Sequence, residues 1–322
     1  MKRFLILCLA ALLSSESFAQ DESAFQFLRL PMSAHAAALG GDNVSVIDDD
    51  HTLAFCNPAL LSAATGGTLN LSYMSYLQGS TVAGASYNMN VGDRSSFAIA
   101  GQYMGFGNMQ RADYEGSIYD EFSAKDMDLS AIYCYNLSDC WSGGVTAKFI
   151  YSNYDIVYSL AVGVDLGLNY YDPESGTSFS LVARQLGGQV KSYDDLHESL
   201  PFNCLMGISK ELAHAPVRLS LTLTDLNRWK GTDFYGAAND SFKDILFRHF
   251  IVGADIFPSE NTWVAVGYNQ MLHKDLSLTE GRSMAGFSLG AGINVNRIKV
   301  GVSYGRYHVA ANSLLMNISY GL

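Results

Sequence analysis

The sequence predicts an all-β fold, a 14-stranded antiparallel transmembrane β-barrel with a short N-terminal plug. Three observations predict it: apolar and polar residues alternate along most of the chain, charged residues are scarce, and an export signal opens the sequence. Charged residues make up only 16% of the chain, whereas soluble domains contain about 25%. The mean hydropathy is +0.08, a value typical of a barrel in which lipid-facing and lumen-facing residues alternate.

The first element, residues 1–19, is expected to be a secretory signal peptide. Two basic residues at 2–3 precede an apolar run at 4–13, and the small residues Ser17 and Ala19 follow. This order predicts cleavage after Ala19. No other stretch has the roughly 18 consecutive apolar residues of a helical membrane span. Export without such a helix leaves a periplasmic, a secreted or an outer-membrane protein.

The second element, residues 20–66, is predicted to be a plug. Between residues 25 and 46 it is rich in alanine and apolar side chains and carries few charges. A segment of that composition is not expected to stay in water as a free tail. The interior of the barrel is the place where it can be buried.

Two short motifs stand out in this plug segment. The run "DDDH" at 48–51 predicts a solvated loop or a helix cap, and a metal site is disfavoured because adjacent side chains point in different directions. Asn57, Pro58 and Ala59 follow it. We interpret these three residues as a plug motif, and a simple turn that ends the preceding segment is the alternative.

The third element, residues 67–322, is predicted to be the barrel. Fourteen segments of about 10–15 residues alternate between apolar and polar positions, which is the size of tilted membrane strands. The clearest is "LAVGVDLGLNYY" at 160–171, which keeps a period of two throughout. The predicted strands are 67–77, 80–91, 95–107, 126–137, 142–153, 157–171, 177–187, 201–211, 216–227, 246–257, 261–272, 283–295, 297–308 and 312–322.

The links between these segments predict the orientation of the barrel. Links such as 92–94, 138–141 and 172–176 are short, whereas 108–125 and 228–245 are long. Short periplasmic turns that alternate with longer outer loops are typical of outer-membrane barrels. The even number of strands then places both ends of the barrel in the periplasm, and the bacterial cell outer membrane is the expected location.

The last predicted strand contains "LLMNISYGL", from Leu314 to Leu322, with an apolar residue at every even position. An edge strand of a soluble sheet needs protection from aggregation, whereas the last strand of a barrel pairs with the first. The stretch resembles the assembly signal of bacterial outer-membrane barrels, although a terminal Phe is commoner there. Taken alone, it is equally compatible with a soluble β-sandwich.

No constellation of residues predicts catalysis, a cofactor or a metal site. The histidines are scattered, and no Ser-His-Asp, Cys-His or paired-carboxylate arrangement stands out. The net charge of −11 disfavours nucleic acid as a partner; membrane lipid is the expected surrounding. Export permits a disulfide between Cys134 and Cys140, but we interpret both as small apolar residues.

One set of charges on the predicted strands is expected to face the lumen. The alternation points Lys148, Asp165 and Arg184 inward on three successive strands. Antiparallel neighbours at similar height can contact one another, so Asp165 is predicted to lie between two cations. Such charges need partners in a wall of low dielectric constant, and a structural pin is favoured over a transport site.

The long link 228–247 is predicted to be a docking loop for a partner at the cell surface. Its apolar and aromatic content exceeds what a solvated loop needs, and a short amphipathic helix is expected from residue 237 onward. A lid over the barrel mouth is the alternative. The residues expected to carry docking are Trp229, Phe234, Tyr235, Phe242 and Leu246.

Two stretches of the plug segment also resemble a known family. "FLRLPMSAHAAALGG" (27–41) and "DDDHTLAFCNPALLS" (48–62) are similar to the N-terminal region of the PorV/PorQ family of the type IX secretion system, and they are closer to PorQ. That family is similar to FadL-like barrels, which have fourteen strands and a plug with an element related to Asn57-Pro58-Ala59. The resemblance covers about thirty-five residues.

This resemblance implies a function without enzymatic activity. The protein would be an outer-membrane component of the type IX attachment complex that anchors a PorZ-like surface partner beside PorU and PorV. The FadL-like architecture implies an alternative, a channel for hydrophobic small molecules. A third class, an outer-membrane hydrolase, would need an active-site cluster at the rim, and the sequence shows none.

Overall fold

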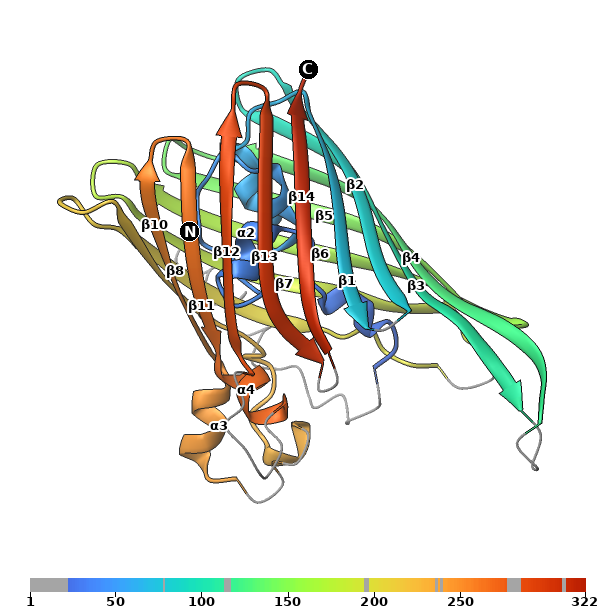
Figure 1. The fold of residues 1–322 in the computed structure, drawn as a ribbon. Coiled ribbons are helices and arrows are strands. Elements are labelled where there is room, and N and C mark those ends of the chain that lie inside the picture. Colours follow the sequence, from blue (N-terminus) through green and yellow to red (C-terminus); the bar gives the residue numbers. More distant parts are fainter. Residues whose placement is uncertain are drawn as a thin grey trace, which may run out of the picture.

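The computed structural model describes residues 23–77, 79–112, 117–193, 197–234, 237, 240–276, 285–308 and 311–322. The predicted signal peptide, the first residues of the plug segment and Tyr235 lie outside this part of the chain. The chain forms one closed antiparallel barrel, and the N-terminal segment lies inside it (Figure 1).

The barrel has fourteen strands, as the sequence predicts, and each pairs with its neighbours in chain order. It closes where β1 pairs with β14, from Thr68 opposite Gly321 to Ser75 opposite Leu314. The strands are β1 (Thr68–Leu77), β2 (Ser80–Val91), β3 (Ser95–Ala112), β4 (Ile118–Asn136), β5 (Trp141–Tyr154), β6 (Val157–Asp172), β7 (Thr177–Lys191), β8 (Asn203–Glu211), β9 (Val217–Leu223), β10 (Phe250–Ser259), β11 (Thr262–Asn269), β12 (Phe287–Val295), β13 (Ile298–His308) and β14 (Ala311–Gly321).

Apolar side chains cover the outside of the barrel. On β1, Leu69, Leu71 and Tyr73 are exposed, while the alternating Asn70 and Ser72 are buried. Other strands add exposed apolar residues to the same band, among them Ile99, Leu129, Phe149, Leu166, Leu219, Val252, Leu289 and Ile318. An apolar band around a closed barrel belongs in hydrocarbon, which places the protein in the bacterial outer membrane.

The two ends of the barrel differ. One end carries short turns, such as the one between β2 and β3, and the C-terminus lies there (Figure 1). Two helices, α3 (Phe242–Arg248) and α4 (Gln270–Leu276), lie at the other end. Because short turns face the periplasm in outer-membrane barrels, we call these ends the periplasmic edge and the outer edge.

Strand boundaries differ from the prediction mainly at the outer edge. β3 and β4 are longer than predicted and reach Ala112 and Ile118. Residues 246–249 and 270–272 were predicted as strand but lie at the end of α3 and in α4. The side chain of Asn269 accepts a hydrogen bond from the backbone N–H of Leu272 (3.1 Å) and caps α4. Alternation of residue types does not detect such a cap.

The plug segment forms short helices inside the barrel: η1 (Gln26–Arg29), α2 (Ala34–Ala38), η2 (His51–Phe55) and η3 (Pro58–Ala63) (Figure 1). Every residue of α2 is buried. Small side chains explain why the helix fits, because alanine methyl groups let it approach the wall closely. Among the described residues, no helix is long and apolar enough to cross a membrane.

The four described cysteines are free. Cys134 is buried and its thiol donates to the carbonyl of Ala59 at 3.3 Å, while Cys140 lies in a turn and is half-buried. Cys134 is thus a small buried residue that also donates one weak hydrogen bond to the plug.

Candidate functional site

The Asn57-Pro58-Ala59 motif docks the plug on the wall. Asn57 caps η3 through the N–H of Ala59 (3.0 Å), and its amide donates to the carbonyl of Val44 (2.8 Å). Pro58 occupies the first turn of the helix, where its missing N–H costs nothing. The motif ends the preceding segment as a turn would, and it also fixes the plug.

Two glycines of the wall make this docking sterically feasible. A Cβ added at Gly144 of β5 would collide with the backbone of Pro58, and one at Gly167 of β6 would collide with the Asn57 side chain. Ser142 of β5 also donates to the carbonyl of Ala59 (3.1 Å). The plug therefore lies directly against the strand backbone at this point.

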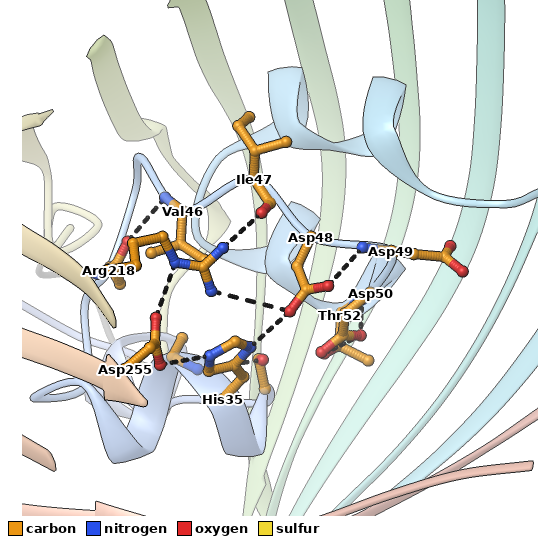
Figure 2. A network of polar contacts seen from close by, with 12 residues as sticks. His35, Val46, Ile47, Asp48, Asp49, Asp50, Thr52, Arg218 and Asp255 are labelled. Atoms are coloured by element: carbon orange, nitrogen blue, oxygen red, sulfur yellow. Dashed lines mark hydrogen bonds and ion pairs between the residues drawn. The ribbon is translucent and has the colours of Figure 1, made fainter. Parts of the chain in front are cut away.

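A second contact between plug and wall is a buried network of charges, shown in Figure 2. His35 of α2 lies 2.8 Å from the carboxylate of Asp255 on β10 and 3.2 Å from that of Asp48. Arg218 of β9 donates to Asp255 (2.8 Å) and to the carbonyl of Ile47 (2.7 Å). Plug and wall thus each supply both a cation and an anion to the network.

The environment of His35 keeps its imidazole charged. Burial by itself lowers the pKa of His35, but the carboxylates of Asp255 and Asp48 outweigh it and raise this pKa from 6.5 to about 9. The ring also stacks on Trp263 of β11, with centroids 4.1 Å apart and planes at 10°. An imidazolium on an indole face is a favourable cation–π pair. His35 therefore holds α2 against two strands.

The acidic run at 48–51 is structural. Asp50 caps η2 by accepting a hydrogen bond from the N–H of Thr52 (2.9 Å), as the sequence predicts. Asp49 forms an ion pair with Lys299 of β13 (2.5 Å). Within the described ranges, no group of three or more His, Cys, Asp or Glu side chains is placed to hold a metal ion.

The predicted triad of Lys148, Asp165 and Arg184 is only partly assembled. Lys148 and Asp165 form an ion pair of 2.7 Å. Arg184 forms its ion pair with Asp42 of the plug at 2.8 Å and acts on Asp165 only as a nearby charge, so one of the two predicted cations pairs with Asp165 and the other does not. A bulge in β7 is the reason: the backbone N–H of Gln185 donates to Asp165 (2.7 Å) and takes the second position.

Toward the outer edge, the interior is apolar. Phe25, Phe27, Leu28 and Met32 of the plug pack against the wall, and we call this group the outer apolar cluster. Its wall residues are Met74, Val82, Met104, Ile150, Ala161, Leu200 and Leu315. The first described residues of the plug thus occupy an apolar space inside the barrel, toward its outer edge.

The segment 25–29, which we call the outer segment, is held by few polar contacts. Gln102 donates to the carbonyl of Phe27 (3.3 Å) and Gln185 to that of Leu28 (3.0 Å). Arg29 forms an ion pair with Asp225 (2.9 Å), which is buried in the link after β9. Burial opposes ionisation of Asp225, but Arg29 and Arg228 hold its pKa below the ordinary value.

The described residues leave a small cavity beside the charge network. It measures about 30 Å³, and its lining includes His35, Asp48, Trp263 and Lys299. A space of that size accommodates about one water molecule. This cavity by itself is too small for a hydrophobic ligand such as toluene.

The predicted docking loop contributes η4 (Gly231–Asp233) and most of α3 to a small cap at the outer edge, and α4 of the link after β11 completes this cap (Figure 1). Arg248 of α3 joins its parts through ion pairs with Asp240 (3.1 Å) and Asp275 (2.5 Å). The short helix expected from residue 237 onward is α3, which begins at Phe242.

The predicted docking residues separate into two groups. Trp229 stacks on Phe242 at 6.3 Å, and the two are 41% and 64% exposed. Phe234 is only 8% exposed and Leu246 is half-buried. Tyr235 lies outside the described residues. Among the predicted docking residues that the structure describes, Trp229 and Phe242 are the exposed aromatic pair.

Sequence reasoning missed the residues that tie the plug to the wall: His35, Asp42, Asp48, Arg218, Asp225 and Asp255. Alternation gave a usable signal for two of them. Arg218 and Asp255 occupy inward positions of β9 and β10, and both are buried. A buried charge needs a partner. The inward charges of Arg218 and Asp255 therefore indicate partners in the plug.

Comparison with solved structures shows the same fold. The toluene transporter TodX of Pseudomonas putida aligns with 90% of this chain and 96% of its own, at 12% identity and a TM-score of 0.56. The toluene transporter TbuX of Ralstonia pickettii aligns with 91% of this chain and 98% of its own, at 11% identity and a TM-score of 0.57. A FadL homologue of Pseudomonas aeruginosa aligns with 90% of this chain and 98% of its own, at 9% identity and a TM-score of 0.53.

Two of these neighbours are toluene transporters, and at such low identity the likeness concerns the fold alone. No protein-family model and no curated protein matches the sequence.

Proposed function

We propose that the protein passes hydrophobic small molecules across the outer membrane, through the space that its outer segment fills. The observation that carries this proposal is the outer apolar cluster, where residues 25–28 lie inside the mouth of the barrel among apolar wall side chains. An apolar ligand of similar size would satisfy the same wall. The fold shared with two toluene transporters supports this function over the others considered.

The distribution of plug contacts suggests which part moves. The deeper plug is tied down by His35, Asp42 and Asp49 and by the Asn57 motif. The outer segment has two neutral hydrogen bonds and one ion pair to the barrel. It is therefore the part with the fewest polar ties to the barrel, and an apolar ligand in its place would restore the apolar contacts of the wall.

Uptake of labelled toluene by cells tests this function. Cells of a bacterial host that produces the protein in its outer membrane should take up toluene faster than cells that produce an unrelated closed barrel. The variant Asp225→Asn should take it up faster still, because it weakens the ion pair with Arg29. Asparagine also tolerates the left-handed backbone of this position, at φ 53°.

The matched control is Asp155→Asn, which weakens the ion pair with Arg111 on the exposed rim. Its uptake rate should equal that of the wild type. If cells with and without the protein take up toluene equally, the proposed passage does not exist.

A second candidate function is that of an anchor for a surface protein. The exposed pair Trp229 and Phe242 on the outer cap favours it, because aromatic side chains are common anchors of interfaces. The resemblance of residues 27–41 and 48–62 to the PorV/PorQ family suggests a PorZ-like partner within type IX secretion. Affinity purification from the native membrane tests it, and recovery of the barrel without any stoichiometric surface protein would remove this candidate.

A further inference from the structure

Asp126 is a buried carboxylate on the inner face of β4, and it belongs to none of the ion pairs formed by the described residues. Its side chain is 3% exposed. It accepts hydrogen bonds from the hydroxyl of Ser152 and from that of Tyr154 (3.3 Å). The interior cation on the neighbouring strand, Lys148, is paired with Asp165. Burying a carboxylate without a cation costs free energy. A carboxylate kept in such a position is therefore a candidate for binding a cationic ligand.

Three aromatic rings gather beside this carboxylate. The rings of Phe106 and Tyr154 lie 5.8 Å apart, and those of Tyr154 and Tyr193 lie 5.5 Å apart, edge to face. Burial raises the pKa of Tyr193 to about 12, with the help of the Asp126 charge and against the effect of the nearby Ser152 hydroxyl. The phenol of Tyr193 thus stays neutral close to Asp126, and its ring face can attract a cation.

Two further carboxylates make the surroundings negative. Asp128, the next inward residue of β4, is buried, and its Oδ1 atom has no hydrogen-bond partner in the described structure. Glu198 acts electrostatically on Tyr193. None of the ion pairs within the described part of the chain includes either residue. Lys148 is the cation that acts on Asp128, and it is already shared with Asp165.

The same place adjoins the outer apolar cluster. Asp126 lies opposite Met104 across the β3–β4 pair, and Met104 is a wall residue of that cluster. Phe106 packs against the cluster as well. A molecule bound here would meet a carboxylate and ring faces at one end and apolar side chains at the other.

We propose that Asp126, Phe106, Tyr154 and Tyr193 bind the cationic end of an amphiphile, an alkylammonium whose chain lies in the outer apolar cluster. The inference rests on the proposed passage and names a substrate class for it. The ammonium group would donate to Asp126 and lie against the rings, while the chain would take the place of the displaced outer segment.

Binding of three probes with the same chain length tests the proposal. Octylamine, 1-octanol and octanoate are equilibrated by dialysis with the full protein in lipid nanodiscs, and empty nanodiscs give the blank. Octylamine should bind at least about tenfold more tightly than octanol, given the strength of charged hydrogen bonds and cation–π contacts. Octanoate should bind most weakly.

The variant Asp126→Asn should lose this preference for octylamine and keep the affinity for octanol. Asp120→Asn, an exposed position on the same strand, should bind all three probes as the wild type does. Tyr193→Leu should weaken octylamine binding without altering the barrel wall. This variant replaces Asp126→Asn as the test of the site if Asp126→Asn fails to fold.

Equal binding of octylamine and octanol by the wild type would overturn the inference and leave the proposed passage intact. If no probe binds above the blank and toluene uptake is also absent, the passage itself is wrong, and the inference falls with it.

Discussion

His35 Nε2 lies 2.8 Å from Asp255 Oδ1 and joins a plug helix to a barrel strand across 220 residues of sequence. The pair is buried on both sides. Breaking such a pair by removing one partner costs about 3–5 kcal/mol, because the remaining charge stays buried. The contact is thus one of the ion pairs that hold the plug to the wall.

The stability that His35 contributes is expected to depend on pH. Its pKa is about 9 in the folded protein and 6.5 when unperturbed. Because the folded value is the higher one, the contribution is complete below pH 6.5 and is lost as the pH rises through about 9. The difference corresponds to about 3 kcal/mol. Free energies of unfolding in urea at pH 6 and pH 9.5 measure it.

The variant His35→Gln is the control for this pH dependence. It removes the titrating group and keeps a hydrogen-bonding side chain, so its free energy of unfolding should change much less over the same interval. An equally steep decline in the variant would mean that other groups are responsible.

The variant Asp165→Leu is expected to destabilise the barrel by about 3–5 kcal/mol. It leaves Lys148 without its ion pair and the N–H of Gln185 without its acceptor. Arg184→Leu should cost less, because its partner Asp42 is 21% exposed and can be solvated. Unfolding temperatures in detergent give the order, and a larger loss for Arg184→Leu would refute this description of the charges.

Removal of residues 20–66 is expected to open the barrel to ions. The plug lies inside the barrel and packs against its wall through two apolar clusters. The truncated chain should still insert, because the strands pair among themselves. In planar bilayers it should conduct, whereas the intact protein should not. A truncated barrel as closed as the intact one would show that something other than the plug blocks the lumen.

Trp229→Ala combined with Phe242→Ala tests the surface-anchor candidate. Both side chains are exposed and stacked on one another, so their loss should leave insertion unchanged and release a bound surface partner into the medium. Phe234→Ala should instead loosen the cap, because Phe234 is buried beside Ala237 and Ile245. Full retention of the partner by the double variant would favour a lid over a docking surface.

The barrel could be predicted well because the alternation that indicates each strand lies within that strand. In β6, a period of two along one strand is enough to place Val162 and Val164 outside and Ala161 and Asp165 inside. Exact strand ends were harder to predict at α4, where the cap formed by Asn269 replaces the strand ladder.

The plug contacts could be predicted only in part, because they depend on how two distant segments meet. Lys148 and Asp165 lie on neighbouring strands, and alternation brought them together. Arg184 faces inward as expected, but its partner Asp42 comes from the plug. Nothing in the alternation of the strands fixes the height or rotation of the plug, so this pairing had no sequence signal.

Hydrogen exchange of the plug in the presence of toluene tests the proposed passage most directly. The amide of Leu28 donates to Phe25 and that of Leu30 to Phe27, and both report on the outer segment. If apolar molecules displace this segment, both amides should exchange faster at saturating toluene, while those of Ala37 and Leu39 in the deeper helix should not change. Unchanged protection of Leu28 and Leu30 under saturating toluene would contradict the proposed passage.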